Sequence, residues 1–133
     1  HLISDSIVME IVLLKSPKYP KKFRVIYPDG TKTDFGLEPY TDYTRHKDPF
    51  RMRSYIQRHG GKIPQRILAL TDPKKIDREM LTVTKSDKEN WTKKGIKSAG
   101  FWSRWLLWSA PSLSKAIKII ENKFNVTIKY ARR

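Results

Sequence analysis

The densest run of chemically capable side chains is the segment DYTRHKD, residues 42–48, with the basic residues that follow it. His46 and His59, with Asp42 or Asp48, are residue types that form acid–base pairs and metal centres. Their spacing matches no familiar set of metal ligands, and the contiguous His-Lys-Asp is not the spaced motif of phospholipase D-like enzymes. We therefore predict no catalytic residue, no metal and no cofactor.

A second pattern, Asp29 with Asp72 and Lys74, imitates the carboxylates and lysine of restriction-type nucleases. Such spacings are common in any lysine-rich chain, so the pattern has little specificity. We expect a protein that is not an enzyme and has no small-molecule substrate, and a nuclease stays open as the less favoured alternative.

The competing interpretation of residues 42–48 is structural. Arg104 is the one cation inside an otherwise apolar, aromatic stretch, and a buried guanidinium without a partner costs several kcal/mol. It must reach a carboxylate, a carbonyl or an aromatic face. We expect Asp42 or Asp48 to pair with Arg104 and so to belong to the structural core.

The aromatic stretch itself, residues 98–109, reads SAGFWSRWLLWS and holds three of the four tryptophans. At about 100° per residue, a helix that begins near Ser98 spreads these side chains over close to half of its circumference. Each aromatic side chain can bury roughly 150–250 Å². The pattern predicts a core helix whose core side chains are Phe101, Trp102, Arg104, Trp105 and Trp108.

The remaining elements must position these groups, and period-two alternation predicts the strands. Residues 10–14 form a short β-rich run, and residues 22–27 alternate charged and apolar side chains. The turn residues 28–30 return the chain through residues 31–35 as a hairpin. Residues 39–46 read as an ordered loop, and residues 126–130 form a final strand.

Helix starts are marked by Asp48-Pro49 and Asp72-Pro73, in which a capping residue precedes proline at the first helical position. They predict helices over residues 49–59 and 73–81. Pro111 opens a third helix over residues 111–124, with an apolar stripe at helical spacing. The first helix is expected to turn these side chains inward: Phe50, Met52 and Tyr55 or Ile56.

These elements together predict an α+β fold, with a small antiparallel sheet, made of the hairpin and the terminal strands, packed against two or three helices. We expect one domain over residues 9–133. Met9 reads as the natural start, so residues 1–8 are expected to be an extension. Residues 62–87 are polar and weakly patterned, which indicates an insertion.

Composition limits the function. The chain has no cysteine, so disulfides and zinc fingers are excluded, and no apolar run approaches the roughly 20 residues of a membrane helix. Its 28 basic and 13 acidic residues give a net charge of +15, spread along the chain rather than gathered in a tail. Such a field predicts a polyanionic neighbour. The residues expected to form the basic face are Arg45, Lys47, Arg51, Arg53, Arg58, Lys93, Lys94 and Lys97.

The order KFRVIYPDG, DFG, DYTRHKDPFRMRSYIQRHGG and ENWTKKGIKSAGFWSRWLLWSAPSLSKAI resembles a family of small, basic, uncharacterised proteins of nucleocytoplasmic large DNA viruses, the giant viruses of algae and protists and their relatives. The similarity covers about residues 9–130, and residues 62–87 depart from it. The family has no established activity. The resemblance implies a viral setting, and small basic viral proteins are often components of the virion.

We therefore expect a structural protein of a large double-stranded DNA virus particle, a minor capsid protein that cements the lattice. It would lie in the capsid shell or interior, and in the host cytoplasm or viral factory during assembly. The expected partners are major or other minor capsid proteins, with nucleic acid and an anionic inner membrane surface as alternatives. The second hypothesis is sequence-independent nucleic-acid binding, with Tyr40, Tyr43 or Trp91 stacking on bases.

Overall fold

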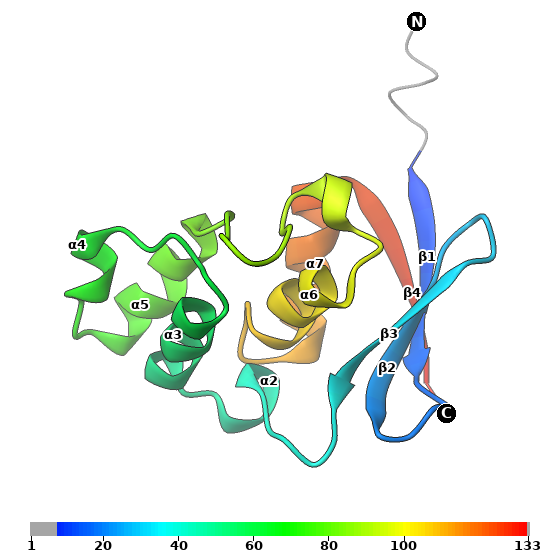
Figure 1. Cartoon of the computed structure of the whole chain (residues 1–133), viewed down its shortest axis with the longest axis horizontal. Helices are drawn as coiled ribbons and strands as arrows, with labels where there is room; N and C mark the ends of the chain where they lie inside the picture. Colours follow the sequence, from blue (N-terminus) through cyan, green and yellow to red (C-terminus); the bar gives the residue numbers. More distant parts are fainter. Residues whose placement is uncertain (1–7, 133) are drawn as a thin grey trace, which may run out of the picture.

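The computed structural model describes residues 8–132 and has an α+β fold, as the sequence predicts. Figure 1 shows the sheet at one end of the molecule and the helices on one side of it. The expected extension, residues 1–8, lies outside the described residues except for Val8. None of the described helices is long and apolar enough to cross a lipid bilayer.

The sheet has four strands in the order β3-β2-β1-β4. The strands are β1 (Met9–Lys15), β2 (Lys21–Ile26), β3 (Lys32–Leu37) and β4 (Val126–Ala131). The β2–β3 hairpin closes where the Tyr27 amide donates to the Thr31 carbonyl, and Gly30 in the turn has a φ of +86° that favours glycine. The predicted hairpin is therefore confirmed.

The pairing of β4 differs from the predicted antiparallel sheet. β4 runs parallel to β1, with Ile11 opposite Ile128, so the sheet is mixed. A parallel pair requires a long crossover connection, and here almost the whole chain separates the two strands. The hydrophobic alternation within a strand indicates which face is buried but not the direction of its neighbour, so the sequence could not specify this pairing.

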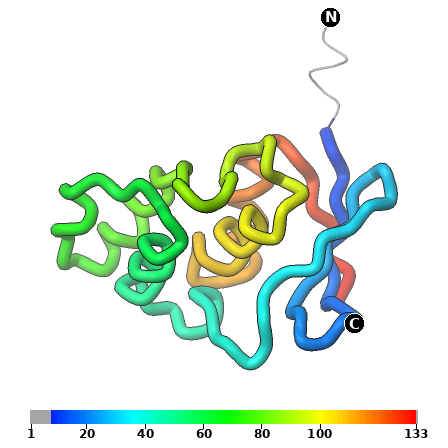
Figure 2. Tube along the Cα trace, viewed as in Figure 1, coloured from blue at the N-terminus to red at the C-terminus, as the bar shows by residue number. Residues whose placement is uncertain are grey.

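The middle of the chain forms a group of short helices, α2 to α5, and Figure 2 shows the stretch with α4 and α5 as the part of the trace farthest from the sheet. Asp48 caps α3 by accepting from the Phe50 amide at 2.9 Å, and Asp72 caps α5 by accepting from the Lys74 amide at 3.0 Å. Both predicted helix starts are therefore confirmed. The described elements are α2 (Tyr43–His46), α3 (Pro49–Arg58), α4 (Gln65–Leu68), α5 (Pro73–Glu79) and the 3₁₀ turn η1 (Met80–Thr82).

Part of the loop predicted over residues 39–46 is the helix α2, which begins after Asp42 because that side chain accepts from the Thr44 amide at 2.9 Å. The predicted inward position of Phe50 is wrong. Its side chain is 41 % exposed and lies under the Arg53 guanidinium, 5.6 Å from the ring centroid. Met52 and Ile56 fill the inner face of α3 instead.

The tryptophan segment begins where predicted, because the Ser98 side chain caps α6 (Ala99–Trp102). The helix then widens into the π-helical turn η3 (Ser103–Leu107). Such π turns are rare, and the 100° spacing of a regular helix does not predict them. The segment passes through the middle of the molecule, so residues 104–110 are buried on every side rather than on one face.

The last helix, α7 (Leu113–Phe124), begins two residues later than predicted. Ser112 caps it by accepting from the Lys115 amide at 3.2 Å, so Pro111 precedes the cap rather than opening the helix. Ala116, Ile120 and Phe124 form its buried stripe. The Phe124 ring contacts those of Phe101 and Trp105, which joins α7 to the aromatic segment.

Residues 62–87 contribute to the core. The segment leaves and returns at one point, where the Lys62 amide donates to the Lys85 carbonyl and the Asp87 amide to the Gly60 carbonyl, each at 2.9 Å. Between these points it supplies four buried apolar side chains: Ile67, Ile76, Met80 and Val83. That the segment is an insertion relative to similar chains stays a prediction.

Candidate anion-binding cleft

The predicted core residues of the aromatic segment are all buried, but the expected partner of Arg104 is wrong. No carboxylate pairs with Arg104 among the described residues. Its guanidinium donates to the carbonyls of Met80 (2.8 Å), Val83 (3.0 Å) and Trp108 (3.0 Å). The guanidinium carbon Cζ of Arg104 lies 4.3 Å from the centroid of the Trp105 ring. The sequence analysis allowed for a carbonyl or an aromatic face, but it could not identify which carbonyls, because backbone groups leave no signal in the residue pattern.

The two predicted carboxylate partners have other roles. Asp42 is buried and accepts from the Lys22 ammonium at 2.8 Å, forming an ion pair shielded from solvent. Asp48 is half-buried and caps α3. Both residues therefore position the DYTRHKD segment, as the structural interpretation expected, but neither does so through Arg104.

A cleft of about 600 Å³ opens between the sheet and the α3 region, and we call it the cleft. The end of β3, the residues after it, α3 and the aromatic segment form its walls. Gly36 allows the close approach of two walls, because a Cβ there would lie 3.1 Å from Leu107 Cδ1. The residues that line the cleft include Lys21, Leu37, Tyr40, Arg51, Tyr55, Arg58, His59, Glu89 and Trp108.

A stack of three rings forms part of the cleft wall. Tyr55 lies between Trp108 and His59, with ring centroids 4.0 Å apart on each side and an angle of 5° to Trp108. Burial, with the nearby Glu89 carboxylate, raises the pKa of Tyr55 to about 12, so the phenol is neutral at physiological pH. The stack presents a rigid aromatic surface that ends at His59.

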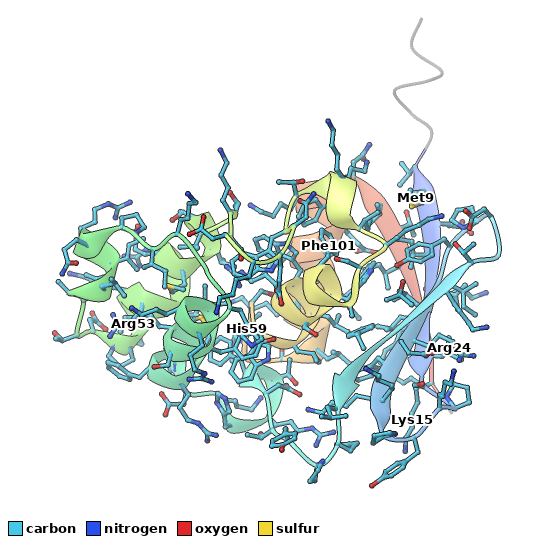
Figure 3. All side chains as sticks on the ribbon, viewed as in Figure 1. Met9, Lys15, Arg24, Arg53, His59 and Phe101 are labelled. Atoms are coloured by element: carbon cyan, nitrogen blue, oxygen red, sulfur yellow. The ribbon has the colours of Figure 1, made fainter. Side chains whose placement is uncertain are left out.

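Glu89 holds the outer ring of this stack in place. One carboxylate oxygen lies 3.2 Å from His59 Nδ1, and the other accepts from the Trp91 indole at 2.7 Å. Gly100 permits this position, because a Cβ there would lie 2.8 Å from the Glu89 carboxyl carbon. Figure 3 shows His59 between the α3 region and the aromatic segment that holds Phe101.

Three cationic side chains of the cleft are uncommitted, which means that they have no hydrogen-bond or ion-pair partner among the described residues. The side chains of Lys21, Arg51 and Arg58 make no hydrogen bond or ion pair within residues 8–132, and all three are exposed. Arg51 and Arg58 also line a neighbouring hollow with Phe50 and Trp108, so the two guanidiniums stand between two depressions. Unpaired guanidiniums beside an aromatic surface are suited to binding phosphate or carboxylate groups.

The structure divides the predicted basic residues into two groups. Arg53 is half-buried and donates to the carbonyls of Ile67 (2.8 Å) and Leu70 (2.9 Å), so it fastens α3 to the α4 region. Arg45 pairs with Glu38, Lys47 donates to the Pro111 carbonyl, and Lys97 pairs with Asp29. Lys93 and Lys94 are exposed and without partners in residues 8–132, on the 3₁₀ turn η2 (Lys93–Gly95). Lys93 and Lys94 do not line the cleft, whereas Arg51 and Arg58 do. The residues of the predicted basic face therefore do not form a single continuous surface.

Of the three aromatic residues predicted to stack on bases, only Tyr40 is accessible, at 67 % exposure. Tyr43 is buried and donates to Asp77 at 2.5 Å. Trp91 is buried, and its carbonyl accepts from the Trp105 indole at 2.9 Å. Sequence reasoning also missed Lys21, Tyr55 and Glu89 as cleft residues, because only the packing of distant segments brings them together.

The residues of each enzymatic alternative, the nuclease-like pattern and the pair of histidines, do not come together in one site. Asp29 lies in the hairpin turn and pairs with Lys97, whereas Asp72 caps α5. His46 accepts from the Asp48 amide through Nδ1 at 3.0 Å and contacts Trp108, while His59 binds Glu89. Within residues 8–132, no group of three or more histidine or acidic side chains is arranged to hold a metal ion.

Comparison with known proteins gives one match. A family of unknown function (DUF5754) matches residues 11–59, which is less than half of the chain. No curated protein and no solved structure matches the chain. The matched segment runs from β1 to the end of α3 and includes Lys21, Arg51, Arg58 and His59. The comparisons indicate no activity for these residues.

Proposed function

We propose that the protein is a non-enzymatic structural component of a large double-stranded DNA virus particle, a minor capsid protein that contacts major or other minor capsid proteins. The resemblance of the DYTRHKD and GFWSRWLLW segments to giant-virus proteins supplies the viral setting. The match to a family of unknown function neither adds to that setting nor opposes it.

The observation that carries this proposal is the division between an aromatic interior and a cationic exterior. Trp91, Trp102 and Trp105 are fully buried, and Trp108 is nearly so. Lysines and arginines without a partner in residues 8–132, such as Lys21 on β2 and Arg51 on α3, are exposed on both the sheet and the helices. A rigid body with charge on many sides suits a protein that fills space between acidic neighbours in a lattice.

The composition of purified particles of the encoding virus tests the proposal. Quantitative mass spectrometry should find the chain at a constant ratio to the major capsid protein after nuclease treatment of intact particles. It should leave the particle only when the shell is dismantled. Finding the chain in infected cells but not in particles would contradict the proposal.

The second candidate function is sequence-independent binding of nucleic acid. The observation that favours it is the set of three uncommitted cations, Lys21, Arg51 and Arg58, on the cleft. Such residues neutralise phosphates and release counterions, and this supplies affinity without base-specific contacts. Tyr40, exposed on the same cleft, provides a ring for stacking.

DNA binding measured at increasing salt tests this second function. The logarithm of the affinity should fall linearly with the logarithm of the salt concentration, and Arg51→Ala should make the slope shallower by about 0.7–0.9. Lys115→Ala, an exposed change of the same charge on α7, is the matched control and should alter the slope less. Affinity that does not depend on salt would contradict nucleic-acid binding.

A further inference from the structure

We infer that the cleft receives one unpaired nucleotide of a single-stranded nucleic acid, with its base against the outer face of His59 and its phosphates on Arg51 and Arg58. This inference rests on the second proposed function and specifies the site and the form of nucleic acid. It combines three features of the cleft: a ring stack whose outermost ring, His59, is partly exposed, guanidiniums without a partner, and exposed apolar side chains.

The His59 ring at the end of the stack favours a ligand with a planar ring. Tyr55 covers one face of the His59 ring at 4.0 Å, and Trp108 covers the far face of Tyr55. His59 terminates the stack, and its side chain is 37 % exposed and lines the cleft. Because Glu89 holds the imidazole, the ring is oriented before a ligand arrives. A base added to the stack would gain the aromatic contact at a small ordering cost.

The uncommitted cations select an anionic group beside that planar group. Arg58 precedes His59 in the chain, and Arg51 lies two helical turns earlier on α3, where both line the cleft. Within residues 8–132 neither guanidinium has a side-chain partner that a phosphate would need to displace. Guanidiniums bind phosphate oxygens in pairs of parallel hydrogen bonds, which fixes the backbone of the strand relative to the base.

The dimensions and rim of the cleft fit a single nucleotide unit. Its volume of about 600 Å³ lies within the range of small-ligand pockets, which is roughly 300–1,000 Å³. Leu37 and Tyr40 stand at its rim with exposed side chains, at 43 % and 67 %, and offer apolar contact to a sugar or a neighbouring base.

The same features favour a single strand over a duplex and over an acidic peptide. In a duplex every base is paired and stacked on its neighbours, so no base can join the His59 stack without being flipped out. The acidic side chains of a peptide would neutralise Arg51 and Arg58, but they carry no ring to stack on His59. A strand of unpaired nucleotides provides both groups at once.

The test uses the whole chain and a labelled oligothymidine that carries one 2-aminopurine, whose fluorescence falls when the base stacks. Fluorescence anisotropy gives the affinity, and the 2-aminopurine signal reports stacking. The variants are the double change Arg51→Ala with Arg58→Ala, and His59→Ala and His59→Phe. The control is the double change Lys115→Ala with Lys118→Ala, which removes the same charge from exposed positions of α7. Thermal unfolding confirms that each variant is folded.

The wild-type chain should bind the single strand at least about tenfold more tightly than a duplex of the same length, and the 2-aminopurine should be quenched. The double arginine variant should lose at least about tenfold in affinity and reduce the salt slope by about 1.4. His59→Ala should lose about five- to a hundredfold together with the quenching, whereas His59→Phe should retain both. The lysine control should retain the quenching.

Four results would overturn the inference. Equal affinity for single strand and duplex, with equal losses in the arginine and lysine variants, would leave nucleic-acid binding in place but remove the cleft from it. Binding without quenching, or with quenching that survives in His59→Ala, would exclude base stacking on His59. Tight binding of a poly-glutamate peptide that oligothymidine does not displace would assign the cleft to an acidic protein. No binding of any nucleic acid would overturn the second proposed function as well.

Discussion

Arg104 carries a positive charge into the centre of the molecule without a carboxylate beside it. The side chain is 1 % exposed and relies on three carbonyl oxygens and the faces of two indole rings, those of Trp91 and Trp105. Burial lowers its pKa to about 9, which expresses the cost of keeping the ion there. The carbonyls come from different parts of the chain, so this one side chain fastens η1 to the end of the aromatic segment.

Replacing Arg104 by methionine tests that role. Arg104→Met keeps an apolar stem of similar length but removes the guanidinium donors from the buried carbonyls of Met80, Val83 and Trp108, of which Met80 still accepts from the Val83 amide. We expect the free energy of unfolding in urea to fall by about 3 kcal/mol or more. Arg66→Met, an exposed change on α4, is the control and should change stability by less than about 1 kcal/mol. An Arg104 variant as stable as the wild type would contradict the role.

His46 gives the folded protein a dependence on pH in the mildly acidic range. Its Nδ1 accepts from the Asp48 amide, so the proton of the neutral ring is on Nε2, which is buried without a partner in residues 8–132. Burial, with the nearby Arg51 guanidinium, lowers the pKa of His46 below its usual 6.5. The unfolded chain therefore binds this proton more readily than the folded protein does.

The contribution of His46 to stability is accordingly complete above pH 6.5 and is lost as the pH falls through the lower pKa of the folded state. In His46→Asn the amide oxygen can accept from the Asp48 amide, but the side chain does not titrate. We expect the fall in the free energy of unfolding between pH 7 and pH 5 to be smaller in this variant than in the wild type. Parallel stability curves for the two proteins would show that His46 does not cause the dependence.

At the scale of elements, the segment over residues 62–87 is closed at its two ends and also packs into the core. Its two ends meet at the bridge between Gly61 and Ser86. Its C-terminal part, close to that bridge, supplies two of the three carbonyls that bind Arg104. The segment therefore has the connection of a removable insertion together with the contacts of a core element.

Deleting residues 63–84 and joining the ends by an Asn-Gly turn tests whether the core contacts of the segment are needed for folding, because the short connection at its base is kept. The bridge geometry accommodates the short connection, but the deletion removes Ile67, Ile76, Met80 and Val83 from the core and two acceptors from Arg104. We expect loss of cooperative thermal unfolding and of the near-ultraviolet circular dichroism of the tryptophans. The double change Lys74→Ala with Lys75→Ala on exposed positions of α5 is the control. A cooperatively folded deletion variant would mean that the segment is dispensable.

At the scale of the whole molecule, the buried pair of Lys22 and Asp42 joins the sheet to the helical part. Lys22 lies on β2, and Asp42 caps α2, so the pair connects the start of the helices to the strand beside them. Both side chains are almost fully shielded from solvent. Removing one charge from such a pair leaves the other buried and unpaired, whereas removing both avoids that cost.

Asp42→Asn retains an oxygen for the α2 cap but removes the charge. We expect it to lower the free energy of unfolding by about 3–5 kcal/mol, since the Lys22 ammonium is left buried. The double variant Lys22→Met with Asp42→Asn should recover most of that loss. Chemical denaturation of the single and double variants measures the coupling, and additive losses would contradict a functional ion pair.

What the sequence determined by itself was local. The caps of α3, α5 and α6, the hairpin turn and the burial of the aromatic segment follow from residues within a few positions of one another, because capping bonds and hydrophobic periodicity act at short range. Only the tertiary structure decided the partners of distant groups: the carbonyls on Arg104, the pairing of Lys22 with Asp42 and the direction of β4. Tertiary packing likewise gathered Lys21, Arg51, Tyr55 and His59 around one cleft, since the meeting of distant segments depends on how the whole core is filled.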